Sequence, residues 1–95
     1  MLKKTIEKNP KDIEACKLLA QILIKEEKIE EALELLTDFA QNSENGDIYY
    51  LMARIFEINE DKDSQRDCLE LALEYKNTLT FDIKAIKQEL KKLKD

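Results

Sequence analysis

The stretch LLAQILIKEEKIEEALELL, residues 18–36, decides the fold of this chain. Its apolar residues recur at the three- and four-residue spacing of an amphipathic helix, interrupted once by the charged run KEEK. Two small residues, Ala20 and Ala32, stand inside the otherwise bulky apolar runs. The stretch therefore predicts two helices joined by a short polar turn, and it raises the question of why each helix carries an alanine.

The composition of the whole chain favours an all-α fold. The chain has 95 residues, enough for one small domain, with one glycine and one proline. Residues that favour helices dominate, and strand signals are poor. The net charge of −5 argues against nucleic acid as a partner. No apolar run approaches the roughly 18 residues that insertion across a membrane requires.

The same apolar spacing predicts further helices along the chain. Asn45 and Asp47 are candidate N-caps beside a turn that contains Gly46. Thr80 is a candidate cap for the last helix. The predicted helices cover residues 11–26, 29–41, 47–58, 64–75 and a last segment from residue 80 onward.

The predicted helices repeat. With an offset of 33, Cys16 falls on Tyr49, Leu19 on Met52, Ala20 on Ala53, Leu23 on Phe56 and Leu36 on Leu69. A further offset of 34 brings Tyr49, Met52 and Phe56 onto Ile83, Ile86 and Leu90. Three segments sharing one pattern at this period indicate a helical repeat protein.

The pattern resembles that of the tetratricopeptide repeat family, whose unit of about 34 residues is a helix hairpin. The motif positions read Cys16-x-x-Leu19-Ala20-x-x-Leu23 then Ala32-x-x-x-Leu36, and Tyr49-x-x-Met52-Ala53-x-x-Phe56 then Gln65-x-x-x-Leu69. The resemblance implies an all-α, right-handed superhelix of antiparallel hairpins in a single domain, residues 1–95. It divides the chain into the end of a preceding helix (1–9, with Leu2 and Ile6), repeat one (12–45), repeat two (46–77) and a capping helix (79–94).

The repeat also accounts for the two alanines. Helices of a hairpin approach closely only where a side chain is small, so Ala20 and Ala32 are the predicted contact pair of the first hairpin. Gln65 stands where the second hairpin would carry its alanine, which predicts a less tight or rotated crossing. Lys87, at the small-residue position of the last helix, fits a cap that no further helix covers.

In this family the first helices of successive hairpins line a concave face that binds extended peptides or partner helices. The residues that the resemblance places on this face are cationic or amide-bearing, with one tyrosine. This composition favours an acidic or carboxylate-bearing peptide. The alternative interpretation is that these residues form ordinary solvated polar faces. The resemblance assigns to the face, as partner-binding residues, Lys17, Gln21, Tyr50, Arg54, Lys84 and Gln88, with Glu14, Asp47 and Glu57 at its edges.

The sequence carries little chemistry of its own. There is no histidine, no glycine-rich phosphate loop and no paired-ligand spacing around Cys16 and Cys68. No metal site, no cofactor and no enzymatic activity are therefore predicted. Two buried, reduced thiols are the expectation, which suits a cytoplasmic location.

The predicted function is a non-catalytic scaffold that binds a peptide or a partner protein. Two alternatives remain open: a self-association module, which would give a homo-oligomer, and a structural segment of a longer repeat protein. The chain starts in mid-pattern, at Leu2 and Ile6. This start favours the expectation that the chain is one piece of a longer repeat protein.

Overall fold

The computed structural model describes residues 12–42 and 45–94. The predicted all-α fold class is confirmed. The predicted N-terminal helix end, residues 1–9 with Leu2 and Ile6, lies outside the described residues. The helices are α2 (Asp12–Lys25), α3 (Ile29–Asn42), α4 (Gly46–Ile58), α5 (Lys62–Glu74), the short 3-10 helix η1 (Lys76–Thr78) and α6 (Ile83–Lys94).

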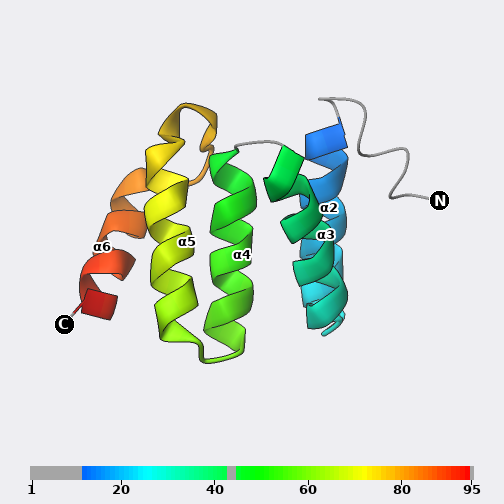
Figure 1. Cartoon of the computed structure of the whole chain (residues 1–95), viewed down its shortest axis with the longest axis horizontal. Helices are drawn as coiled ribbons and strands as arrows, with labels where there is room; N and C mark the ends of the chain where they lie inside the picture. Colours follow the sequence, from blue (N-terminus) through cyan, green and yellow to red (C-terminus); the bar gives the residue numbers. More distant parts are fainter. Residues whose placement is uncertain (1–11, 43–44, 95) are drawn as a thin grey trace.

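The helices form a row of antiparallel hairpins (Figure 1). α2 pairs with α3 and α4 pairs with α5, while α3 also packs against α4. α6 lies against α5 at the C-terminal end of the row. α2 and α4, the first helices of the two hairpins, are also in contact, so one surface of the molecule is built from both.

The turns inside the two hairpins are alike and lie one repeat apart. Glu27 and Glu60 both take the left-handed backbone conformation, with φ of 65° and 60°. In each turn the following residue donates its backbone N–H to a carbonyl of the preceding helix: Lys28 to Leu23 at 2.8 Å, and Asp61 to Phe56 at 2.9 Å. The offset of 33 found in the sequence is therefore repeated in the backbone.

Two buried clusters form the core, and α4 lies between them. The first cluster joins α2 and α3 to Ile48, Leu51 and Ile55 of α4. The second joins Ala53 of α4 to α5 and α6, with Met52 packed against both clusters. The single stripe through Met52 and Ala53 that the repeat pattern assigned to α4 is thus incomplete. A helix that packs against the first hairpin on one side and against its own partner α5 on the other needs apolar side chains on both sides, and one stripe does not describe it.

The small residues lie deep in the hairpins. Ala20, Ala32 and Ala53 are fully buried. Gln65, at the remaining small-residue position, is only 5% exposed, and its amide donates to the Glu89 carboxylate of α6 at 2.6 Å. This hydrogen bond to α6 satisfies the buried amide of Gln65. The side chain therefore does not need to turn toward solvent, which would separate the two helices of the second hairpin.

Gly46 belongs to α4, although the sequence predicted it in the preceding turn. Asn45, a predicted cap, accepts the backbone N–H of Asp47 at 2.9 Å, so α4 begins at Gly46. A Cβ atom at Gly46 would lie 2.7 Å from the carbonyl oxygen of Tyr75, just beyond α5. The missing side chain therefore lets the start of α4 approach the end of α5 closely.

The prediction that Thr80 caps the last helix is wrong. Its backbone N–H and its hydroxyl both donate to Asp47, each at 2.7 Å. Asp82 instead accepts the backbone N–H of Lys84 at 3.0 Å, at the start of α6. Thr80 is occupied by a tertiary partner that local spacing does not identify.

Candidate functional site

The six residues predicted to bind a partner lie on the three helices that the repeat assigns to one face. Gln21, Lys84 and Gln88 are exposed, on α2 and α6. Lys17, Tyr50 and Arg54 are half-buried, and each contacts another side chain of the protein. Half of the set is therefore engaged in contacts within the protein, and the other half is exposed to solvent.

Lys17 reaches a buried carboxylate. Its ammonium group lies 2.7 Å from Asp47 Oδ2 and 3.1 Å from Glu14 Oε2, and only 12% of its side chain is exposed. Asp47 is fully buried and also accepts both hydrogen bonds from Thr80. The prediction that Asp47 lies at the edge of the face is therefore wrong, because this carboxylate ties α2, α4 and the segment before α6 together.

The contacts of this ion pair shift the pKa of both partners. Burial alone would raise the pKa of Asp47, but hydrogen bonds from Lys17 and Thr80 outweigh burial and lower it. Burial alone would lower the pKa of Lys17, but its bonds to Asp47 and Glu14 outweigh burial and raise it. Both groups are therefore held in their charged forms at neutral pH.

Tyr50 forms part of a small aromatic and cationic stack. Its ring lies 4.3 Å, centroid to centroid, from the ring of Phe81. The guanidinium carbon of Arg54 lies 5.3 Å from the centroid of the Tyr50 ring. Such contacts fix the orientation of the tyrosine ring and attach the segment before α6 to α4.

Arg54 is also paired with carboxylates. It donates to Glu57 at 2.7 Å and, more weakly, to the two oxygens of Glu89 at 3.3 and 3.4 Å. Glu89 also accepts the hydrogen bond from Gln65. The positive charge that the sequence assigns to this part of the face is thus largely balanced within the protein.

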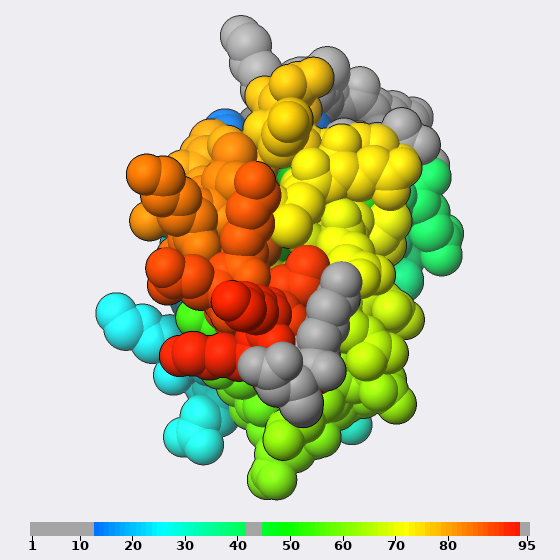
Figure 2. All heavy atoms as spheres, turned by 90° about the vertical axis from the view of Figure 1, so that its left-hand side faces the viewer, coloured from blue at the N-terminus to red at the C-terminus, as the bar shows by residue number. Residues whose placement is uncertain are grey.

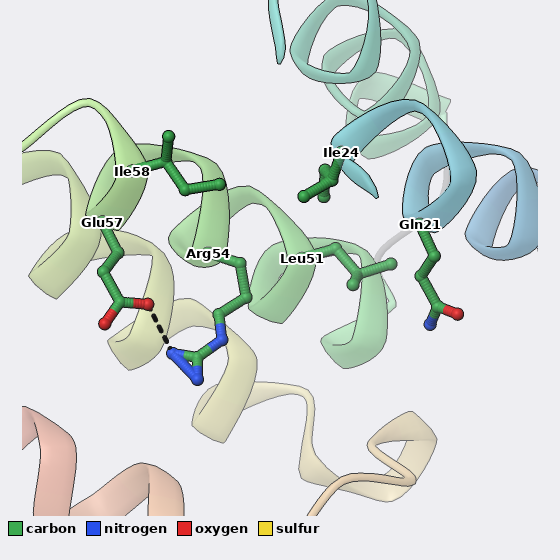
Figure 3. Close-up of a pocket in the computed structure, with 6 residues that line it drawn as sticks. All are labelled: Gln21, Ile24, Leu51, Arg54, Glu57 and Ile58. Atoms are coloured by element: carbon green, nitrogen blue, oxygen red, sulfur yellow. Dashed lines mark hydrogen bonds and ion pairs between the residues drawn. The ribbon is translucent and has the colours of Figure 1, made fainter. Parts of the chain in front are cut away.

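A hollow of about 320 Å³ lies between α2 and α4 (Figure 3). Figure 3 shows Arg54 turned toward Glu57 on its rim. Three of the lining side chains are apolar, and Ile58 is half exposed. The hollow is lined by Gln21, Ile24, Leu51, Arg54, Glu57 and Ile58.

The hollow unites only part of the predicted set. It brings Gln21 and Arg54 together, whereas Lys17, Tyr50, Lys84 and Gln88 are not among its lining residues. Sequence reasoning did not identify Ile24 and Ile58. Both are large apolar residues outside the packing pattern of the repeat, and that mismatch is the signal that could have identified them.

The two thiols are structural. Cys16 and Cys68 are buried and unbridged. Burial raises the pKa of Cys16 to about 12 and, with the nearby Asp67 and Asp61 charges, that of Cys68 to about 11. A thiol protonated at neutral pH is a poor nucleophile and a poor metal ligand.

The side-chain clusters and the helix lengths of residues 12–42 and 45–94 concern metal binding and membrane insertion. In this part of the chain, no three of the Cys, Asp or Glu side chains gather in a group that could hold a metal ion. Nor does any helix in it have the length and apolar character needed to cross a bilayer.

Comparison with known proteins identifies a family. A family model described as tetratricopeptide repeat matches residues 1–55, which include α2, α3 and most of α4. No curated protein and no solved structure matches the chain. The matched part contains the first hairpin and most residues that line the hollow.

Proposed function

The chain belongs to the tetratricopeptide repeat family, and from that premise we propose that it is a non-catalytic module that binds a segment of a partner protein between α2 and α4. Proteins of this family generally mediate protein–protein interactions. In this proposal the hairpins are repeat one (12–45) and repeat two (46–77), followed by the capping helix (79–94). The observation that carries the proposal is the hollow between α2 and α4, the first helices of the two hairpins, with three apolar side chains in its lining.

The chemistry of the hollow favours an apolar side chain of the partner. Ile24, Leu51 and Ile58 offer it an apolar contact, while Gln21 offers an amide for hydrogen bonding. Arg54 already faces two carboxylates, so it attracts an acidic group less strongly than an unpaired arginine would. The predicted preference for an acidic peptide therefore depends on cations elsewhere on the face, such as Lys84.

Site-specific photocrosslinking tests the proposal. A photoreactive phenylalanine analogue at Ile58, which is half exposed, is expected to crosslink a partner in a lysate of the source cells. The same analogue at Asp67, an exposed position on α5 outside the hollow, is the matched control. Mass spectrometry of the crosslinked band would identify the partner and the segment that enters the hollow.

The outcome at the two positions decides the proposal. A partner crosslinked from Ile58 and not from Asp67, and displaced by excess unlabelled domain, supports binding at the hollow. Crosslinking from both positions alike, or from Asp67 alone, contradicts it. Circular dichroism of both labelled proteins would establish that neither label changes the helix content.

Leu18 and Ile22 favour self-association as a second candidate function. They are 61% and 51% exposed, and they lie four residues apart on the same side of α2. Large apolar side chains that remain exposed next to each other are typical of surfaces that contact another protein. In this alternative a second copy of the chain covers them.

The second candidate predicts a mass that depends on concentration. We expect sedimentation velocity to show dimers of the wild type at high concentration, and monomers for Leu18→Glu/Ile22→Glu. Neither substitution removes a buried contact, so the helix content is expected to stay unchanged. A wild type that remains monomeric at every concentration would rule this alternative out.

A further inference from the structure

The outer side of α6 is strongly basic, although the chain as a whole is acidic. Residues 83–94 contain five lysines and one glutamate, in a chain with a net charge of −5. Lys84, Lys87 and Lys91 are exposed, and their spacing of three and four residues places them on one side of the helix. We call these three residues the lysine face. Figure 2 views the end of the molecule where α6, orange to red, lies beside the yellow α5.

The lysine face is not neutralised within the described part of the protein. Lys17 and Arg54 each face two carboxylates. No ion pair joins Lys84, Lys87 or Lys91 to any carboxylate of residues 12–42 and 45–94. These three lysines therefore attract an approaching anion more strongly than the cations predicted on α2 and α4.

The rest of α6 is held in the core, so its lysine face has a fixed position. Ile86 and Leu90 are buried in the second cluster, against α4 and α5. The only carboxylate of the helix, Glu89, is directed toward Gln65 and Arg54. Ile86, Leu90 and Glu89 thus face the rest of the protein, and the lysine face lies on the outer side of α6.

We propose that the lysine face of α6 binds an acidic segment of a partner protein, with carboxylates spaced to meet Lys84, Lys87 and Lys91. This inference rests on the proposed function, since it names the chemistry of the partner. The three lysines span about 10 Å along the helix, at 1.5 Å for each residue. A short run of glutamates or aspartates covers that length.

Longer or flatter anions fit this surface less well. A nucleic acid duplex would extend past α6 and meet exposed carboxylates of α5 such as Asp63 and Asp67. A membrane surface would need apolar side chains to insert, but Ile86, Leu90 and Leu93 of α6 pack in the second cluster and, of its apolar side chains, only the small Ala85 is exposed. A short acidic segment meets neither obstacle.

The test measures binding of a fluorescein-labelled oligoglutamate peptide by fluorescence anisotropy. The variant is Lys84→Glu/Lys87→Glu/Lys91→Glu. The control, Lys25→Glu/Lys62→Glu/Lys76→Glu, changes three other exposed lysines and so has the same net charge. We expect the α6 variant to bind at least about tenfold more weakly than the control, and wild-type binding to weaken as salt is added. Equal loss in both variants overturns the proposal.

Further probes distinguish the other possible occupants. The choice of partner would be overturned if labelled double-stranded DNA, or vesicles containing phosphatidylserine, bound more tightly than oligoglutamate and if the α6 variant lost that binding. Self-association abolished by the same variant would also overturn it, in favour of a second copy. Crosslinking from Ile58 is a separate measurement. An absence of partner binding at the hollow can therefore be distinguished from an absence of peptide binding at the lysine face.

Discussion

Replacing Asp47 with alanine is expected to lower the free energy of unfolding by about 3–5 kcal/mol. The carboxylate is fully buried and accepts bonds from Lys17 and from both donors of Thr80. Its removal leaves the half-buried Lys17 ammonium with only the exposed Glu14 as partner, and leaves the Thr80 donors unpaired. Urea unfolding followed by circular dichroism at neutral pH measures the change. Asp67→Ala, at an exposed position on α5, is the matched control and should change stability by less than about 0.5 kcal/mol.

The difference between wild type and Asp47→Ala should depend on pH. The folded-state pKa of Asp47 is lowered, so its contribution is complete above the unfolded value of about 3.9 and is lost as pH falls through the lower folded value. The folded-state pKa of Lys17 is raised, so its contribution is complete below about 10.4 and is lost as pH rises through the higher folded value. We therefore expect a constant difference from about pH 5 to about pH 9 and a smaller one below about pH 4. A difference that grows in acid would contradict the buried ion pair.

Local periodicity was sufficient to predict the helices. Each helix buries a side at helical spacing, so the predicted and observed helices agree to within a few residues. The repeat offset of 33 predicted from large residues reappears in the turns at Glu27 and Glu60. The two alanines of the first hairpin are both fully buried. These features depend on contacts within one hairpin. The spacing of apolar and small residues along the sequence is sufficient to predict such contacts.

Features that depend on how the hairpins pack together were not predictable in this way. α4 contacts the first hairpin on one side and α5 on the other, so Ile48, Leu51 and Ile55 are buried, whereas of the predicted stripe only Ala53 is fully buried. Thr80 has the chemistry of a helix cap, yet its partner is a carboxylate 33 residues earlier in the chain. Local sequence identifies candidate caps from neighbouring residues alone, so it cannot identify a hydrogen-bond acceptor that is distant in the chain.

The candidate site shows the same limit. The types of residue on the predicted face are plain from the sequence, but the sequence does not reveal which partners their charges act on. Lys17 and Arg54 were counted as cations available to a ligand, and the structure pairs both internally. Lys84, Lys87 and Lys91 form no ion pair with the described residues, which moves the cationic part of the surface to the C-terminal helix.

Replacing Gly46 with valine is expected to lower the free energy of unfolding by about 3 kcal/mol, at the upper end of the range for overpacking. A Cβ atom at this position would lie 2.7 Å from the carbonyl oxygen of Tyr75 and 3.0 Å from that of Ala72. Both contacts are with backbone, which cannot change rotamer, so α4 would have to move away from α5. The bond from the Gly46 N–H to the Thr78 hydroxyl, now 2.8 Å, would lengthen with it.

The sign of the effect of Gly46→Ala makes this prediction decisive. At an unhindered helical position, glycine to alanine raises stability by about 0.5–1 kcal/mol, because alanine loses less backbone freedom on folding. At Gly46 we expect the opposite sign, with alanine destabilising and valine destabilising more. Lys62→Val, at the exposed first position of α5, controls for a β-branched residue at a helix start and should have little effect. If Gly46→Ala stabilised the protein in urea unfolding, α4 and α5 could not approach as closely in solution as the structure has them.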